Sequence, residues 1–296
     1  MNKRPWSSVL HENHRIWNYI NLLRKQGSFI CPNGQILSFT RSNQIDIKKL
    51  YRFSLIYGVN FSNRKGCWNY EDGIITTPNG IRFKIDNFDS LIFAETFLSD
   101  IHFSDVNLKD KIVIQAGGFI GDTALYYASR GAKVYSFEPD INSYNLALEN
   151  IKLNPELSES IVMRNYAVGS DEEIDFPITT TGSGGSSAYN LKGMKTVKIK
   201  SVSVSAILDE FSINEPFLLD LDIKGKEFEV IKDDSIPRFK MVRIEYSTMI
   251  GNNKIGTRDE ILNRLRELGF KNIRIFKHNG LAYDLEDHGT IETIRD

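Results

Sequence analysis

Three glycines and one acid between positions 117 and 138 have the types and spacing to bind a nucleoside. Gly117, Gly118 and Gly121 interrupt an apolar run and precede a segment with helical periodicity. A glycine turn that opens a helix presents bare backbone N–H groups at the carboxyl edge of a parallel sheet, where nucleotide-like ligands bind. Glu138 lies 21 positions after Gly117. At this separation an acid that leaves the second strand accepts hydrogen bonds from both ribose hydroxyls.

The spacing of these glycines distinguishes between cofactor classes. A dinucleotide-binding turn has glycines at positions i, i+2 and i+5, and its middle glycine lets a pyrophosphate approach the backbone. Here the glycines fall at i, i+1 and i+4, and Phe119 occupies the place of the middle glycine. The turn therefore argues against NAD or FAD. The alternative is an ordinary strand–helix crossover whose glycines serve only packing.

Two acidic residues in the second half of the chain have positions suited to proton transfer. Asp222 ends the apolar run 216–222, and the β-prone run 241–246 carries Glu245 near its end. The carboxyl ends of parallel strands meet at one edge of a sheet, where two carboxylates orient a hydroxyl and accept its proton. Asp222 has a structural alternative, because an aspartate also caps the N–H groups of a following helix. His278 is a weaker candidate, since a histidine beside a hairpin turn is usually exposed.

Alternating strand and helix patterns must position these residues. Short apolar runs predict buried parallel strands, and apolar residues at i, i+3 and i+4 predict the helices between them. The strands are expected at 112–114, 134–137, 161–166, 196–202, 216–222 and 241–246, and the helices at 121–128, 143–153, 206–211, 225–231 and 257–268. Thr257 and Glu260 form a capping box for the last helix. A terminal hairpin about Asn279 and Gly280 completes an α/β fold.

The pattern of the first hundred residues predicts a separate mixed α/β extension, in which we recognise no catalytic or binding motif. Hairpins, each built on a Pro-Asn-Gly turn, are expected at 28–39 and 73–85, and helices at 5–27, 47–57 and 89–98. His11 and His14 share a helix face, but two histidines without a third ligand are typical of a solvated face. We therefore divide the chain into an N-terminal extension, 1–100, which is expected to serve as a substrate lid, and a cofactor-binding domain, 101–296.

Composition and charge exclude several function classes. The 296 residues include 37 Lys and Arg against 38 Asp and Glu, so no basic excess indicates a nucleic-acid partner. Cys31 and Cys67 lie far apart, outside the spacing of a zinc site, and indicate reduced thiols. No apolar run approaches membrane-spanning length, and residues 1–30 lack a signal-peptide core. We expect a cytoplasmic protein without a metal, a nucleic-acid partner or a membrane span, and its oligomeric state is left open.

Three stretches of the chain resemble one enzyme family. GGFIGDTALYYASRGAKVYSFEPD, residues 117–140, resembles the opening of the FkbM family of S-adenosylmethionine (SAM)-dependent methyltransferases, which reads approximately D-V-G-A-N-I-G-D-T and continues to F-E-P. AVGSDEE, 167–173, is similar to the family's A-V-G-D segment. PFLLDLDIKGKEFEVI, 216–231, resembles K-I-D-V-E-G-A-E-x-E-V-L, and Asp222, Gly225, Glu227 and Glu229 match it residue for residue. The resemblance spans about residues 74–285.

The resemblance implies a Rossmann-like class I methyltransferase fold, with a seven-stranded, mostly parallel sheet and a C-terminal antiparallel hairpin. It implies SAM as the cofactor and assigns cofactor binding to Gln115, Gly117, Gly118, Phe119, Gly121, Asp122, Glu138 and Asp222. Asp222 and Glu245 are the candidates for catalysis. The glycine- and serine-rich stretch 179–190 is either a flexible linker or, as a similar Gly-Ser-Ser segment of the family implies, a loop at the ligand edge.

Four positions depart from the family pattern. Gln115 replaces an Asp, Phe119 an Asn, Asp220 a Lys and Lys224 a Glu. A neutral amide at position 115 still forms hydrogen bonds, but it cannot attract the positive charge of SAM. The changes at 220 and 224 resemble a charge swap, which predicts an ion pair between these two residues with the signs reversed.

The favoured function is SAM-dependent O-methylation of a hydroxyl on a sugar, glycan or small metabolite. The segment DLDIKG lacks the Asn- or Asp-Pro-Pro-aromatic motif of amino-methylating DNA enzymes and the nucleophilic Cys of cytosine C5 enzymes. Two alternatives stay open. One is a methyltransferase-like SAM-binding module that has lost catalysis, which the four departures would explain. The other is an NAD-dependent oxidoreductase, which the glycine spacing disfavours.

Overall fold

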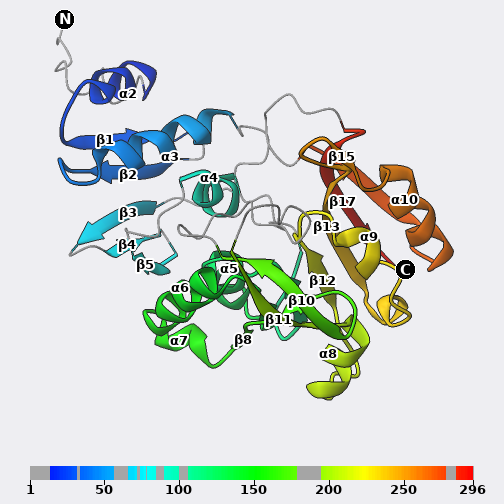
Figure 1. The fold of residues 1–296 in the computed structure, drawn as a ribbon. Coiled ribbons are helices and arrows are strands. Elements are labelled where there is room, and N and C mark those ends of the chain that lie inside the picture. Colours follow the sequence, from blue (N-terminus) through cyan, green and yellow to red (C-terminus); the bar gives the residue numbers. More distant parts are fainter. Residues whose placement is uncertain are drawn as a thin grey trace, which may run out of the picture. The chain divides into compact units, whose positions relative to one another are not determined.

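The structure is a computed structural model that describes residues 14–31, 34–56, 66–71, 74–77, 79–84, 90–99, 106–178, 195–277 and 285–295. The chain divides into two compact units, Met1–Val106 and Asn107–Asp296 (Figure 1). His11, His278, the turn at Asn279 and Gly280, and the stretch 179–190 lie outside the described residues. Among the helices in the described ranges, none combines the length and apolarity needed to cross a bilayer.

The first unit is built on a five-stranded sheet of order β1-β2-β3-β4-β5. Its strands are β1 (Gly27–Ile30), β2 (Gln35–Phe39), β3 (Gly66–Glu71), β4 (Ile74–Thr76) and β5 (Arg82–Lys84), and its helices are α2 (His14–Leu22), α3 (Gln44–Ile56), α4 (Ser90–Phe93) and the π-helical η2 (Ala94–Ser99). The antiparallel pairs β1–β2 and β4–β5 confirm both predicted hairpins. The rings of Phe39 and Tyr51 stack on Phe29 with centroids 4.9 and 4.3 Å away, so α3 packs on the first hairpin.

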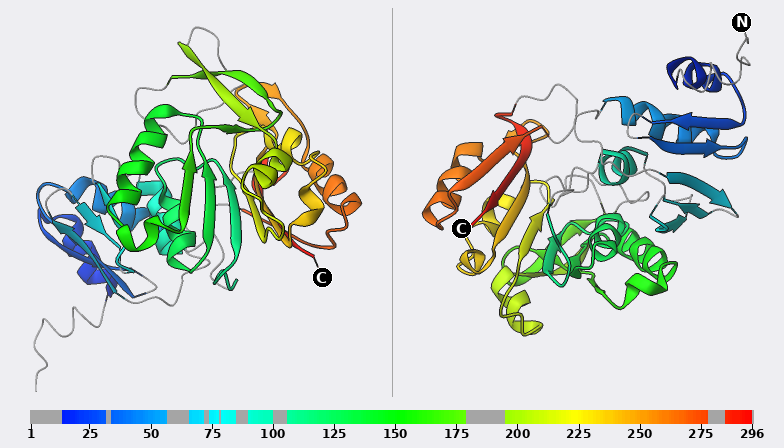
Figure 2. Two further views of the ribbon diagram at one scale, coloured as in Figure 1. Left: turned by 90° about the horizontal axis from the view of Figure 1, so that it is seen from below. Right: turned by 180° about the vertical axis from the view of Figure 1, so that it is seen from behind.

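The second unit contains a seven-stranded sheet of order β16-β17-β13-β12-β6-β7-β8. Its strands are β6 (Ile112–Ala116), β7 (Lys133–Phe137), β8 (Ile161–Arg164), β12 (Leu218–Leu221), β13 (Met241–Ser247), β16 (Asn272–Phe276) and β17 (His288–Ile294). Neighbours from β8 to β13 pair in parallel, while β17 runs antiparallel to both β13 and β16. The left view of Figure 2 shows the strands from β6 to β8, in green, side by side.

This sheet confirms the predicted Rossmann-like class I methyltransferase fold. One detail of the expected terminal hairpin differs from the prediction. The partner of β16 is His288–Ile294, which begins beyond the residues expected to follow the turn at Asn279 and Gly280. Because β17 is antiparallel, its first residues lie at the same edge of the sheet as the carboxyl end of β13.

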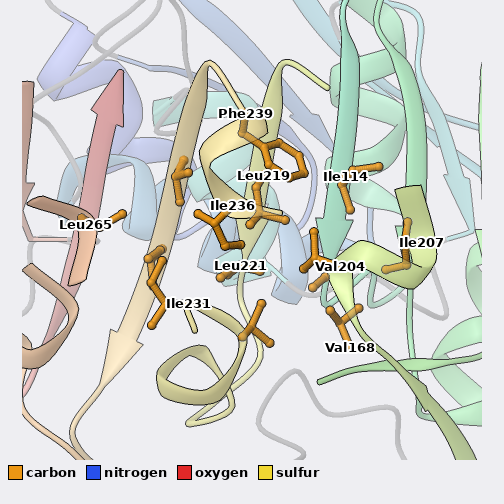
Figure 3. Close-up of a cluster of buried hydrophobic side chains, with 14 of the residues drawn as sticks. Ile114, Val168, Val204, Ile207, Leu219, Leu221, Ile231, Ile236, Phe239 and Leu265 are labelled. Carbon is orange, nitrogen blue, oxygen red and sulfur yellow. The ribbon is translucent and has the colours of Figure 1, made fainter. Parts of the chain in front are cut away.

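One face of the sheet carries the apolar core of the second unit. Residues such as Ile114, Leu219 and Leu221 of the strands belong to one buried cluster with Val204 and Ile207 of α8, among others (Figure 3). The helices on this face are α8 (Val204–Glu210), α9 (Glu227–Val230) and α10 (Arg258–Glu267), with the 3-10 turn η3 (Ile236–Arg238). The capping box of α10, between Thr257 and Glu260, is present as predicted.

The opposite face of the sheet is covered by α5 (Asp122–Ser129), α6 (Ile141–Lys152) and α7 (Pro155–Ser158). It carries a buried polar network, because successive strand residues point to opposite faces. The Tyr127 hydroxyl of α5 donates to Asp220 Oδ2 over 2.7 Å, and Arg243 Nη1 of β13 lies 2.8 Å from Asp220 Oδ1. All three side chains are almost completely buried.

Two small sheets were not predicted as such. β9 (Ala167–Val168), β10 (Glu172–Pro177) and β11 (Thr196–Val202) form a three-stranded sheet, although only the last of these strands was expected. β14 (Met249–Ile250) and β15 (Asn253–Lys254) form a short hairpin after β13. Neither sheet changes the order of the central sheet, which positions the residues discussed below.

Candidate functional site

The glycine turn between β6 and α5 has an unusual backbone. Gly117, Phe119 and Gly121 have φ angles of 91°, 41° and 80°, in the left-handed region. Glycine adopts this region at little cost, and asparagine enters it more readily than other residues. Phe119 therefore replaces the residue type best suited to its φ, since the family has asparagine there. The fold holds Phe119 in place through its backbone N–H, which donates to Glu138 Oε2 over 2.8 Å.

The hydrogen bonds of this turn show that one expectation from the sequence was wrong. The N–H groups were expected to be bare, but those of Gly117 and Gly118 both donate to Phe137 O, and that of Gly121 donates to Gly118 O. Together with the bond from Phe119 to Glu138, these contacts tie the turn to the end of β7. The turn shapes the edge of the sheet, and four of its N–H groups are satisfied within the protein.

The first two glycines are required by packing. A Cβ at Gly117 would collide with the carbonyl oxygen of Asp222, at the end of β12. A Cβ at Gly118 would collide with Ser136 Oγ and the Met163 side chain. The packing alternative therefore applies to both positions. The absence of a side chain at Gly117 also brings the first turn and the end of β12 together.

Glu138 is the acid at the end of β7, and it is buried. Its Oε2 accepts from Phe119 N–H and its Oε1 from Asp140 N–H, each over 2.8 Å. A carboxylate oxygen accepts two hydrogen bonds, so each oxygen retains capacity for one further donor. Burial raises the pKa of Glu138 to about 7, against the lowering effect of the two N–H donors.

Two further predicted cofactor residues are buried beside the turn. The Gln115 Oε1 accepts from Ser136 Oγ over 2.8 Å, which fixes the amide against β7. Asp122 lies in the first turn of α5, and burial raises its pKa to about 7. The Thr123 hydroxyl donates to Asp122 Oδ2 over 3.2 Å.

The predicted catalytic residues meet at the carboxyl edges of β12 and β13. The Lys224 Nζ lies 3.2 Å from Asp222 Oδ1 and 2.7 Å from Glu245 Oε1. The Asp222 side chain is 40% exposed and that of Glu245 only 5%. Burial disfavours the charged form of Lys224, but the two carboxylates outweigh it and raise the pKa of the ammonium above its usual value. Lysine thus bridges the two acids, an arrangement that the sequence analysis missed.

These contacts show that the predicted ion pair between Asp220 and Lys224 is wrong. Asp220 pairs with Arg243 on the face covered by α5, whereas Lys224 pairs with Asp222 and Glu245. Lys224 has a φ of 42°, which turns the chain after β12 and directs the ammonium to the two carboxylates. The two departures from the family pattern therefore belong to two different ion-pair groups.

The capping role considered for Asp222 is not supported by the start of α9. The N-cap of this helix is Lys226, and it has no side-chain cap hydrogen bond. Instead, the buried carboxylate of Glu227 holds the loop after β12 in place through hydrogen bonds. Its Oε2 accepts from Gly225 N–H, and its Oε1 accepts from Ser247 N–H over 2.8 Å. Burial raises the pKa of Glu227 to about 7. The match of Glu227 to the family pattern was the sequence signal for this role.

His288 is a second residue that the sequence analysis missed. It begins β17 and pairs in register with Ser247 at the end of β13. Its Nδ1 lies 3.0 Å from Ser247 Oγ, and its Nε2 lies 3.9 Å from Glu245 Oε1. The β-branched residues Thr and Ile, which make up four of the last five positions of 288–294, were the signal that could have placed this strand.

The residues at this edge fit SAM. Glu138 is an acid at the end of the second parallel strand with capacity for hydroxyl donors, as a ribose requires. Asp222 is partly exposed and lies at the end of the adjoining β12, where the backbones of the two strands meet at Gly117. The side-chain amide of Gln115, in contrast, already accepts a hydrogen bond from Ser136, so its main role is to support the neighbouring residues at this edge.

Comparison with known proteins points in the same direction. A family model described as the methyltransferase FkbM domain matches residues 115–271, slightly more than half of the chain. A hexuronic acid methyltransferase, AglP, from Haloferax volcanii is 24% identical over 125 residues. This match covers 42% of this chain and 50% of the relative, so it spans about half the length of that protein.

Three solved structures to which this chain has a low similarity carry the name of a methyltransferase. A precorrin-6y C5,15-methyltransferase from Geobacter metallireducens has a TM-score of 0.39 at 10% identity, covering 67% of this chain and 87% of its own. A magnesium protoporphyrin IX methyltransferase from Synechocystis with bound SAM has a TM-score of 0.37 at 11% identity, covering 64% and 72%. The METTL16 methyltransferase domain has a TM-score of 0.42 at 10% identity, covering 99% and 93%.

Proposed function

This chain belongs to the FkbM family of SAM-dependent methyltransferases, and from that premise we propose that it methylates a hydroxyl on a sugar, glycan or small metabolite. The observation that carries the proposal is the group formed by Asp222, Lys224 and Glu245 at the carboxyl ends of two adjacent parallel strands. Hydroxyls hydrogen-bond to such charged groups through their O–H and their oxygen. The hexuronic acid methyltransferase similar to this chain supports a sugar as the acceptor class.

In this proposal, Glu138 binds the ribose of SAM, and the glycine turn and Asp122 shape the cofactor side of the edge. Bound SAM supplies an activated methyl group on a positively charged sulfur. The protein has to hold the acceptor oxygen in line with that methyl group and exclude water. Asp222 and Glu245, which Lys224 holds in place, orient the acceptor hydroxyl.

The test is methyl transfer to a defined set of sugars. The purified chain is incubated with methyl-labelled SAM and glucose, galactose, glucuronic acid or galacturonic acid, and the products are analysed by mass spectrometry. A methyl ether on a hydroxyl survives mild alkali, whereas a methyl ester on a uronic acid is hydrolysed. We expect a product of the first kind. Label that is lost in alkali would refute hydroxyl methylation and point to the carboxyl group.

Variants connect the activity to the site. Asp222→Asn and Glu245→Gln should each lower kcat by about a hundredfold, because a misplaced acceptor oxygen loses alignment with the methyl group. The affinity of Glu245→Gln for SAM should stay close to that of the wild type. Asp171→Asn is the matched control, since this exposed aspartate bonds Ser203 and is not part of the site. Equal rates in all three variants would remove the two acids from the site.

The second candidate function is a SAM-binding module without catalysis. The bridging ammonium of Lys224 favours it, because it occupies both carboxylates that would otherwise contact an acceptor. Calorimetry separates the two functions. Tight binding of SAM without transfer to any of the four sugars would favour the module.

A further inference from the structure

Glu245, Ser247 and His288 form an array of side chains at the ends of β13 and β17, and the proposed function uses only Glu245 of the three. The imidazole of His288 lies between two groups of β13. Its Nδ1 is 3.0 Å from Ser247 Oγ, and its Nε2 is 3.9 Å from Glu245 Oε1. The His288 side chain is 20% exposed. The imidazole is therefore held by β13 and still accessible.

The topology places this array at the reaction edge. Glu245 and Ser247 are two residues apart on β13, so they point to the same face of the sheet. They pair in register with Thr290 and His288 of the antiparallel β17. Glu245 also contacts Lys224, which contacts Asp222 at the end of β12. A continuous series of side-chain contacts thus connects His288 to the proposed acceptor-binding acids.

The carboxylates are poorly suited to accept a proton. Lys224 is cationic, and its ammonium lies 2.7 Å from Glu245 and 3.2 Å from Asp222. A nearby positive charge favours the ionised form of a carboxylate and so lowers its proton affinity. An imidazole has the side-chain chemistry that exchanges protons near neutral pH. This makes His288 the better proton acceptor at this edge.

We propose that His288 accepts the proton of the acceptor hydroxyl through Nε2, and this inference rests on the proposed O-methylation. The acceptor oxygen bonds the methyl carbon, and the carbon–sulfur bond breaks and leaves its electron pair on sulfur. The O–H proton passes to His288 Nε2. Glu245 then faces the new imidazolium and stabilises its charge. This role requires the tautomer in which Nδ1–H donates to Ser247 Oγ and the lone pair of the neutral ring is on Nε2.

The charged groups around the imidazole agree with this role. Glu245 of β13 lies 3.9 Å from Nε2 through its Oε1. Lys224 pairs with Glu245 from the loop after β12, and Glu227 accepts from the backbone of Ser247. Asp287 precedes His288 in the chain and contacts Thr248. Of these four groups, three are acidic, and Glu245 is the one placed to face an imidazolium.

The tautomer of His288 provides a test that does not depend on activity. Two-bond proton–nitrogen NMR spectra of the full chain with nitrogen-15 histidine, recorded at pH 8, distinguish the two ring nitrogens. The His288→Asn variant assigns the signals. We expect a proton on Nδ1 and a lone pair on Nε2. A proton on Nε2 instead would overturn the proposal, because that nitrogen could not accept another.

Kinetics provide the second test, with whichever of the four sugars named above is methylated. His288→Asn keeps an N–H donor for Ser247, so it preserves the contact and removes the base. We expect kcat to fall by about two to four orders of magnitude. The decline of the wild-type kcat at low pH, measured at saturating SAM, should disappear, and the affinity for SAM should remain within twofold. Free imidazole should partly restore the rate of His288→Ala.

Unchanged kcat and pH profile in His288→Asn would overturn the proposal while leaving O-methylation intact. If none of the four sugars is methylated by the wild type, the proposed acceptor class fails. In that case the NMR spectra still decide whether Nε2 is able to accept a proton, so the two failures are distinguishable.

Discussion

The ammonium of Lys224 lies 2.7 Å from the carboxylate of Glu245, which is only 5% exposed. This contact joins the turn after β12 to the end of β13. The left-handed φ of Lys224, 42°, turns the backbone so that the ammonium reaches Glu245. Asp222 contacts the same ammonium at 3.2 Å. One cation therefore fixes both acids that we assign to the acceptor.

Removal of this cation should destabilise the fold. Lys224→Met leaves the buried Glu245 without the ammonium, and we expect the free energy of unfolding to fall by about 1–3 kcal/mol. Lys226→Met is the matched control, because its partner Glu229 is 35% exposed and such pairs contribute less than about 1 kcal/mol. Urea unfolding at pH 7 measures both. Equal losses in the two variants would contradict a special role for Lys224.

Loss of the buried ion pair between Asp220 and Arg243 should lower the free energy of unfolding more than loss of the Lys224 ammonium. Asp220→Asn leaves the Arg243 guanidinium buried without its counter-charge, which should cost about 3–5 kcal/mol. Asp175→Asn is a suitable control, since its partner Lys198 is exposed and the loss should stay below about 1 kcal/mol. Thermal unfolding followed by circular dichroism compares them. A small effect of Asp220→Asn would mean that Tyr127 and the new amide satisfy the arginine.

Gly117→Ala separates backbone strain from packing. Gly251 has a φ of 58°, and no atom of the described residues lies within 4 Å of the position that a Cβ would take there. Gly251→Ala should therefore cost only the positive φ, about 1–2 kcal/mol. Gly117 has a φ of 91°, and its Cβ would also collide with the Asp222 carbonyl, so we expect a cost several times larger in urea unfolding. Equal losses of unfolding free energy in Gly117→Ala and Gly251→Ala would show that the ends of β6 and β12 move apart easily.

Glu138 should make SAM binding depend on pH. Burial raises its pKa to about 7, above the ordinary value of 4.5, so the ligand-free fold retains a proton that the unfolded chain releases. This group's contribution to stability therefore falls as the pH rises from about 4.5 to about 7. Ribose hydroxyls prefer the ionised carboxylate, so SAM affinity should be about tenfold weaker at pH 6 than at pH 8.

Calorimetry at several pH values tests this dependence. Glu138→Gln should bind SAM more weakly than the wild type and lose the share of the pH dependence that Glu138 contributes. Glu138→Ala should lose about tenfold to a hundredfold in affinity, since a charged acceptor of hydroxyl hydrogen bonds is removed. Unchanged affinity in Glu138→Ala would refute the ribose contact.

The sequence by itself determined the features that depend on neighbouring residues. Short apolar runs and helical spacing identified the parallel strands of the central sheet and most of the helices that cover it, because these patterns follow from local backbone geometry. The capping box of Thr257 and Glu260 depends on residues three positions apart, and it was read directly. The glycine spacing and Glu138 indicated a nucleoside ligand other than a dinucleotide, and the resemblance to the FkbM family indicated SAM.

Only the tertiary structure decided which charges meet. Lys224 and Glu245 are 21 positions apart, Asp220 and Arg243 are 23 apart, and Ser247 and His288 are 41 apart. Each contact depends on the register of neighbouring strands, which local patterns do not contain. The charge swap inferred from Asp220 and Lys224 failed for this reason. One residue lies within a strand and points to the face covered by α5, while the other turns the chain at the edge of the sheet.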